Sequence, residues 1–228
     1  MGCDGGPNGD PTIFARELDA SKATGAHWYR GDVTSLGEAD YVVSMTRPRG
    51  LKVLAVLGGS AKWLNPALCS AVPARYGPSH GGGIDAVELA NGGGALPGDA
   101  VSWHPYLDWA GFNAPGQWTW TANLHALMAL HGDANKQVWA TETGASTSGF
   151  HSVDLATQAS IAGQIVAHWH QFGSYAGALF FYEVRDHPAA GGLAASDPAS
   201  RDQNYGLLYS NFTPKPAYAA FAAAIATS

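Results

Sequence analysis

Short apolar segments alternate with amphipathic segments along the chain, and this pattern predicts strands that alternate with helices. The clearest strand covers residues 51–57, where an almost continuous apolar run ends at two glycines, as is typical of a parallel strand covered on both faces. The longest helix is expected at 154–172, where Gly173 ends it. Further strands are expected at 27–33, 84–90, 100–103, 137–140 and 178–183, and further helices at 12–24, 38–47, 64–76 (short or kinked), 122–131 and 216–226. This order predicts one α/β domain over residues 1–228, with parallel strands and right-handed crossovers.

One connection in this series is too short for a regular crossover. The stretch between the strands at 84–90 and 100–103 is rich in glycine and has no helical pattern. A parallel crossover needs about a dozen residues or more and usually contains a helix. An eight-stranded barrel typically needs about 250 residues, and this chain has 228. Either a unit is missing here or the two strands are not neighbours in the sheet.

Composition narrows the class of protein and of ligand. The chain is 46% hydrophobic and 13% charged with 29 glycines, which indicates a well-packed domain with many tight turns. A net charge of −6 without a basic stripe argues against a nucleic-acid partner, and no apolar run approaches the roughly 18 residues that would cross a membrane. The chain has two cysteines, Cys3 and Cys69, which could form one disulfide or stay as two free thiols. Because the histidines lack zinc-site spacing and the glycine runs lack phosphate-loop endings, we expect no metal and no cofactor.

Glu142 is the first candidate for chemistry, because it comes just after the apolar residues 137–140 and before Gly144, which allows a sharp turn. In parallel α/β proteins, side chains at the C-terminal ends of strands form the active site. From this segment alone, an ion-paired structural glutamate is an equally good interpretation. Aromatic residues beside turns, such as Trp109 and Trp118, suit stacking on sugar rings, although ordinary loop anchors also explain them.

A series of motifs lies along the chain at residues 23–32, 50–59, 75–78, 84–89, 102–106, 139–144, 205–208 and 215–218. Taken in order, these motifs resemble the clan A glycoside hydrolases, in particular their cellulase-like and family 39-like members. The resemblance runs from about residue 12 to 226, apart from the break at 91–99. It implies a compact (β/α)8 barrel of the TIM type with a shortened or missing strand-five unit, whose first strand would lie in the first ten residues.

The resemblance also implies an active site at the C-terminal ends of the barrel strands. Glu142 at the end of strand seven would be the nucleophile of a retaining hydrolase that acts on β-linked polysaccharide or oligosaccharide. Arg30 at the end of strand two would hydrogen-bond its carboxylate. The residues implied in substrate binding are Arg30, Asn91, His104, Tyr106, Tyr182 and Asp186. Members of the family are often secreted and need no cofactor.

Strand four departs from the family at the position of the general acid/base. The family pattern there is Glu-x-Trp-Asn-Glu-Pro, whereas residues 88–93 of this chain read Glu-Leu-Ala-Asn-Gly-Gly, which places Gly92 at the acid/base position. Retaining hydrolysis uses two carboxyl groups about 5–5.5 Å apart, and glycine has none. Glu88 is a candidate catalytic replacement, although four residues of extended strand place it roughly 13 Å from Gly92. The other neighbouring carboxylates are Glu183, Asp186 and Asp32.

Two classes of function therefore stay open, and both have a carbohydrate as partner. One is an active glycosidase; the other is a catalytically impaired or silent carbohydrate-binding barrel that has lost its acid. The missing unit would leave an open sheet edge, and such edges favour association, so a homodimer is a hypothesis beside a monomer. The first residues, Met1 to Asp4, lack the basic and apolar parts of a signal peptide, which leaves the compartment open.

Overall fold

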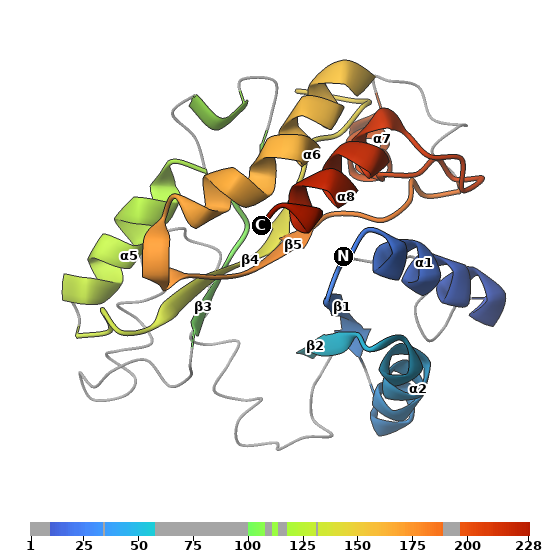
Figure 1. The fold of residues 1–228 in the computed structure, drawn as a ribbon, viewed down its shortest axis with the longest axis horizontal. Coiled ribbons are helices and arrows are strands. Elements are labelled where there is room, and N and C mark those ends of the chain that lie inside the picture. Colours follow the sequence, from blue (N-terminus) through green and yellow to red (C-terminus); the bar gives the residue numbers. More distant parts are fainter. Residues whose placement is uncertain are drawn as a thin grey trace.

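The structure is a computed structural model that describes residues 10–33, 35–57, 100–107, 111–113, 118–130, 132–188 and 197–228. The described residues form an α/β fold whose strands pair in parallel in two sheets (Figure 1). The α/β class predicted from the sequence is therefore confirmed, whereas the eight-stranded barrel stays a prediction. The predicted elements at 64–76 and 84–90 lie outside the described residues, as do Glu88, Asn91 and Gly92.

Every helix and strand predicted within the described ranges is present. The strands are β1 (Trp28–Val33), β2 (Lys52–Leu57), β3 (Ala100–Trp103), β4 (Gln137–Thr143) and β5 (Ala176–Phe181). The α-helices are α1 (Pro11–Ala23), α2 (Leu36–Thr46), α5 (Trp120–Leu130), α6 (Leu155–His170), α7 (Pro198–Asp202) and α8 (Pro216–Ala226). Short 3-10 helices are η1 (Arg47–Arg49), η3 (Gly111–Asn113) and η4 (Gly173–Tyr175). Among the described α-helices, α7 is the one that the pattern of the sequence does not predict, and the short 3-10 helices are not predicted either.

Side-chain caps set the starts of three helices. Asp10 accepts a hydrogen bond from the Thr12 amide at 2.8 Å at the start of α1, and Asp154 accepts one from the Thr157 amide at 2.7 Å at the start of α6. Ser35 does the same at the start of α2. Each cap satisfies an amide that has no partner within the first helical turn, which stabilises the helix by about 1 kcal/mol.

The strands form one sheet in the order β1-β2 and another in the order β3-β4-β5. Helix α2 lies between β1 and β2 in the sequence, α5 between β3 and β4, and α6 between β4 and β5, as parallel pairing requires. Because the pairing is parallel, the C-terminal ends of the strands of each sheet lie on the same side. The two sheets meet through side chains: the Trp28 ring on β1 packs 5.8 Å from the Trp139 ring on β4 and 6.2 Å from the Phe180 ring on β5.

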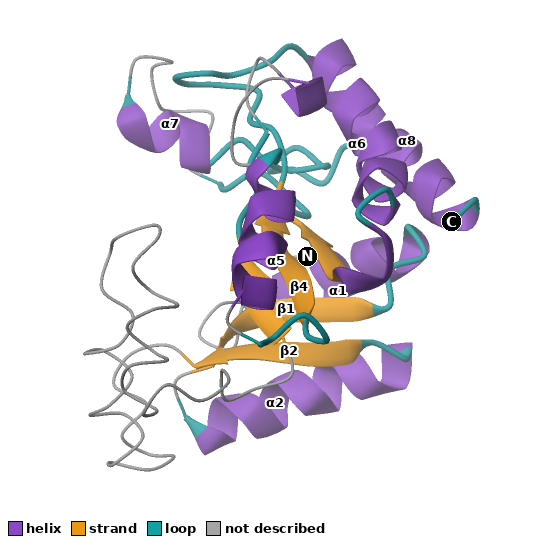
Figure 2. Ribbon diagram, turned by 90° about the vertical axis from the view of Figure 1, so that its left-hand side faces the viewer, coloured by secondary structure: helices purple, strands orange, loops and turns teal. Residues whose placement is uncertain are grey.

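Two apolar clusters form the core. The larger one joins α6 and α8 to β4 and β5, and the two helices lie side by side (Figure 1). Its buried members on α6 are Ile161, Ala162, Ile165, Val166 and Trp169. The smaller cluster joins α1, α2 and β1 through Phe14, Leu18, Tyr29, Val42 and Leu51. In Figure 2, α2 runs along β2, and the α6–α8 pair lies at the far end of the molecule from it.

Among the described helices, none has both the length and the apolar character that spanning a membrane would require.

Candidate functional site

Glu142 lies near the C-terminal end of β4, and its side chain is 19% exposed. The strand runs to Thr143, beyond the end predicted at residue 140, so Glu142 belongs to the strand and does not follow it. The register between β4 and β5 shifts between Ala140 and Thr143, and such irregularities change the direction in which a side chain points. Gly144, two residues after Glu142, lies close to the residue that follows β5: a Cβ there would overlap the carbonyl oxygen of Tyr182. The ends of β4 and β5 therefore need a glycine at this position.

Three side chains hold the two oxygens of the Glu142 carboxylate. Arg30 on β1 places its Nη2 atom 2.8 Å from Oε1. Tyr106, which follows β3, donates its hydroxyl proton to Oε2 at 2.5 Å. His104 places Nδ1 3.3 Å from the same Oε2. The structure thus brings together four of the residues predicted to form the site, and it fixes the carboxylate from two sheets.

The protonation of the two neighbours of Oε2 follows from their surroundings. Burial raises the pKa of Tyr106, and its hydrogen bond to the Glu142 carboxylate raises that pKa further, so the phenol stays protonated and remains a donor. Burial lowers the pKa of His104 below 6.5; the charge of Glu142 opposes this shift and that of Arg30 adds to it. At neutral pH, Arg30 is therefore the group that brings positive charge to Glu142.

Glu142 faces a pocket of about 450 Å³, a volume within the range of small-molecule sites. The lining consists of Tyr106, Glu142, Tyr182, Arg201, Asp202 and Tyr205. The three tyrosine rings pack against one another with centroids 5.4 to 6.1 Å apart. Flat faces with hydroxyl groups at the rim suit a ligand that has both apolar and hydrogen-bonding surfaces.

The pocket also contains residues that sequence reasoning did not select. Arg201 and Asp202 come from α7, which lies in a stretch expected to be a loop. The signal that could have revealed this helix is Asp197 followed by Pro198, since proline is favoured at the first helical position. Tyr205 lies within a motif that carried the family resemblance, but the motif gave it no role.

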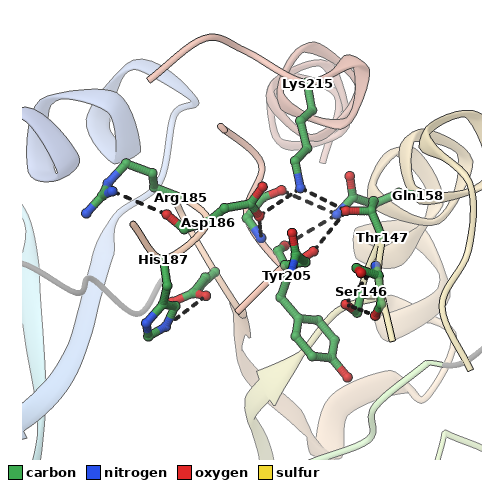
Figure 3. Close-up of polar contacts among 12 residues, drawn as sticks. Ser146, Thr147, Gln158, Arg185, Asp186, His187, Tyr205 and Lys215 are labelled. Atoms are coloured by element: carbon green, nitrogen blue, oxygen red, sulfur yellow. Dashed lines mark hydrogen bonds and ion pairs between the residues drawn. The ribbon is translucent and has the colours of Figure 1, made fainter. Parts of the chain in front are cut away.

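Asp186, predicted to bind substrate, lies elsewhere. It is 4% exposed, does not line the pocket, and accepts hydrogen bonds from Lys215 Nζ at 2.8 Å and from the Gly206 amide at 2.9 Å (Figure 3). Burial raises the pKa of Asp186, and the neighbouring Lys215 offsets only part of this shift. The structure therefore does not bring Asp186 to the described pocket, and its carboxylate is buried in an ion pair with Lys215.

The structure also describes Glu183 and Asp32, which were the two other candidates for the missing acid. Neither of them lines the pocket. Glu183 is 2% exposed, and its Oε1 lies 3.5 Å from His187 Nε2. Asp32 is exposed on β1. Tyr182, by contrast, lines the pocket as predicted.

A buried polar network lies behind the pocket and holds Tyr205 in place. The Gln158 amide on α6 donates to the carbonyl oxygens of Ala145 at 3.0 Å, Gly206 at 3.3 Å and Tyr205 at 3.4 Å. Figure 3 shows that the Tyr205 ring points away from this network. The backbone of the segment is therefore anchored to α6 while its ring is left for the pocket.

Within the described ranges, no three histidine, cysteine, aspartate or glutamate side chains gather in a way that could hold a metal ion.

No protein-family model matches the chain, and no curated protein matches it either. Solved structures do match. A family 39 glycoside hydrolase from Bacteroides cellulosilyticus WH2 has a TM-score of 0.62 and 19% identity, over 98% of this chain and 63% of that one. A GH5_18 protein from Bifidobacterium longum subsp. longum, solved in complex with Manb1-4GlcNAc, has a TM-score of 0.63 and 13% identity, over 98% of this chain and 75% of that one.

A GH39 enzyme from Xanthomonas axonopodis pv. citri is also similar, with a TM-score of 0.53 and 13% identity, over 93% of this chain and 62% of that one. This chain therefore spans less than two thirds of the length of either family 39 protein. The likeness confirms, at the level of fold, the resemblance to clan A glycoside hydrolases predicted from the sequence.

Proposed function

We propose that the chain is a retaining β-glycoside hydrolase in which Glu142 is the nucleophile. We further propose that residues 1–228 form one compact (β/α)8 barrel domain with a shortened or missing strand-five unit. The observation that carries the functional proposal is the fixed Glu142 carboxylate, held at both oxygens by Arg30 and Tyr106 and facing a tyrosine-lined pocket. Hydrolysis of a β-linked polysaccharide or oligosaccharide is the chemistry that this arrangement and the fold support best.

In the first step, a Glu142 oxygen attacks the anomeric carbon of a sugar in the pocket while the bond to the leaving-group oxygen breaks. Arg30 and Tyr106 favour the ionised form of the nucleophile and hold it in one direction, because hydrogen bonds to a charged acceptor are strong and directional. In the second step, water attacks the same carbon, its proton passes to the group that protonated the leaving group, and Glu142 leaves as a carboxylate. Tyr182 and Tyr205 supply rings on which the sugar stacks.

The leaving group also needs a proton, and we assign this role to Glu88. It lies outside the described residues, as does Asn91, which we place beside the sugar by family resemblance. Glu183 and Asp186 are already enclosed by protein, which argues against these two carboxylates as the acid.

A second candidate function is a catalytically impaired or silent carbohydrate-binding barrel. The observation that favours it is Gly92, which stands where the family has its acid/base glutamate. Such a protein would keep the pocket and its tyrosines but would fail to protonate an ordinary leaving group.

The test compares aryl β-glycosides, whose leaving groups need little protonation, with unactivated β-glucans. The chains compared are the native one, Glu142→Gln, Glu88→Gln and, as a matched control on α2, Glu38→Gln. We expect Glu142→Gln to lower the rate on both substrate types at least about a thousandfold, and Glu88→Gln to lower it mainly on the glucans. Native turnover of aryl glycosides alone would establish the impaired enzyme. Binding of oligosaccharides without any turnover would establish the silent barrel, and activity that survives in Glu142→Gln would overturn the nucleophile assignment.

A further inference from the structure

Arg201 is held rigidly at the wall of the pocket that contains Glu142. Its Nε donates to the Tyr205 hydroxyl at 2.9 Å, and its backbone carbonyl accepts from Ser146 Oγ at 2.7 Å. A Cβ on Gly149 would come within 2.8 Å of the Arg201 Cα, so the two backbones are in close contact. These contacts fix the base of the side chain and one edge of its guanidinium group.

The outer edge of this guanidinium group has no acidic partner in the part of the chain that the structure describes. Neither Nη1 nor Nη2 of Arg201 forms an ion pair or hydrogen bond with a described residue. Asp202 follows directly in α7, but consecutive residues of a helix do not face each other, and no ion pair joins the two. Arg30, in contrast, is paired with Glu142. The positive charge of Arg201 is therefore available to a ligand in the pocket.

We propose that Arg201 binds the carboxylate of a uronic acid residue, so that the pocket takes glycosides of hexuronic acids. The two Nη atoms form a planar pair of donors that matches a carboxylate in bidentate geometry. The Tyr205 contact uses Nε, so the two Nη atoms are left for a ligand in the pocket. Arg30 offsets the charge of Glu142 at 2.8 Å, so that Asp202 is the other acid in the described lining that an anionic substrate meets. This inference rests on the proposed function for the assignment of the pocket as a sugar site.

The experiment compares sugars that differ only at C6. The substrates are the p-nitrophenyl β-glucuronide and β-glucoside pair and the β-galacturonide and β-galactoside pair. The proteins are the native chain, Arg201→Gln, Arg201→Lys and, as a matched control, Arg47→Gln, whose side chain is exposed at the end of α2. The quantity measured is the ratio of kcat/KM for the uronide to kcat/KM for its neutral counterpart. A loss of folded protein cancels in this ratio.

We expect the native chain and Arg47→Gln to favour one of the uronides at least tenfold, and Arg201→Gln to lose that preference. Arg201→Lys should keep only part of the uronide preference, because an ammonium group lacks the planar pair of donors that a guanidinium group has. A native preference for the neutral sugars, or a ratio that Arg201→Gln leaves unchanged, would overturn the inference.

A binding measurement separates this inference from the proposed function. Calorimetric titration of Glu142→Gln with the same glycosides should show tighter binding of the uronide, and Arg201→Gln in that background should remove the difference. If nothing is hydrolysed but this difference is found, the hydrolase proposal fails and the uronate site stands. If neutral glycosides are hydrolysed through Glu142 without any uronide preference, the uronate site fails and the hydrolase stands.

Discussion

At the scale of single residues, the site depends on how Glu142 is held, and the phenol of Tyr106 is a neutral donor to its carboxylate. Its hydrogen bond to Oε2 joins a neutral group to a charged one, and such bonds contribute about 1.5–3 kcal/mol. Because Tyr106 also packs against Tyr182 and Tyr205, its ring position does not depend on the hydroxyl. Removal of the hydroxyl therefore tests the hydrogen bond and little else.

We expect Tyr106→Phe to lower kcat/KM for hydrolysis by about 10- to 100-fold, since about 1.4 kcal/mol corresponds to a factor of ten. The measurement is steady-state kinetics on an aryl β-glycoside. Tyr175→Phe, which removes a hydroxyl on η4 before β5, is the matched control. Equal kcat/KM values for the two variants would show that the hydroxyl does not support the nucleophile.

His104 gives the site a pH dependence whose sign can be worked out. Its folded-state pKa lies below the ordinary value of 6.5, with burial as the main cause. As the pH falls through 6.5, the unfolded chain therefore takes up this proton before the folded chain does. The free energy of unfolding should decrease from about pH 6.5 down to the folded-state pKa of His104, and this group should cause no further decrease below that pH.

The matched variant is His104→Gln, measured by urea unfolding at several pH values between about 5 and 7.5. The free energy of unfolding of the native chain, minus that of the variant, should become smaller as the pH falls through this window. A difference that is the same at every pH would contradict the lowered pKa.

At the scale of elements, the site exists because β4 and β5 come together at their C-terminal ends, and Gly144 allows this. An added methyl group there would overlap the Tyr182 carbonyl oxygen, which belongs to the backbone and has little room to move. Gly163 on α6 offers a contrast, because its Cβ would meet the Ala220 methyl at 3.5 Å, an ordinary contact.

We expect Gly144→Ala to lower the free energy of unfolding by about 1–3 kcal/mol through overpacking and to lower activity by displacing Glu142. Gly163→Ala should leave stability unchanged or raise it by up to about 1 kcal/mol, because alanine is the better helix former. Urea unfolding and aryl glycoside kinetics on both variants provide the test. Equal stability of the two variants would show that the strand ends are not constrained.

The start of α8 is fixed to the segment after β5 by the buried pair of Lys215 and Asp186. Burial lowers the pKa of Lys215 and raises that of Asp186, so enclosing the two charges is costly and their attraction offsets only part of the cost. Lys215 Nζ also donates to Thr147 Oγ1 at 3.1 Å, which connects the pair to the segment after β4.

We expect Lys215→Met to lower the free energy of unfolding by about 3–5 kcal/mol, because it leaves Asp186 buried without its cation. The double variant Lys215→Met with Asp186→Asn should lose less than the sum of the two single changes. A double-mutant cycle by urea unfolding measures this difference. Additive losses would mean that the two charges do not support each other.

Local pattern explains which elements could be predicted. Apolar runs and caps lie in short stretches of sequence, so most helices and strands of the described ranges are predicted to within about two residues; the strand predicted at 178–183, for example, is β5 at 176–181. The last residues of β4 were missed because Thr141, Glu142 and Thr143 are polar, and backbone pairing with the distant strand β5 extends β4 to Thr143. Helix α7 was missed because its five residues are too few to show a period.

At the scale of the whole molecule, contacts between distant parts of the chain decide what the sequence cannot show. Glu17 on α1 and Arg185 after β5 are buried together at 2.8 Å, although 168 residues separate them. In the sequence both read as exposed charges, since glutamate and arginine are rarely buried unless paired. The family resemblance supplied Arg30, His104 and Tyr106 for the site, but it placed Asp186 there as well, because residue type alone does not reveal burial.

The proposed homodimer belongs to this scale as well. The missing unit would leave a sheet edge whose backbone groups pair with those of a second chain. Light scattering at several protein concentrations should then give twice the 23.7 kDa mass of one chain. A strictly monomeric mass would contradict the homodimer and leave the monomer.

The contact between Arg30 and Glu142 also has a mechanical consequence. Arg30 lies two residues after Trp28, whose ring packs against β4, and its ion pair with Glu142 is a second contact between the two sheets. The same ion pair therefore both orients the nucleophile and stabilises the packing of the two sheets. When the sugar is esterified to Glu142, the carboxylate loses its negative charge and the ion pair with Arg30 is lost. Hydrolysis of the ester by water restores both. Under the proposed mechanism, the contact between the two sheets therefore weakens and strengthens once in each turnover. Amide hydrogen exchange in β1 should be faster in the trapped ester than in the free protein.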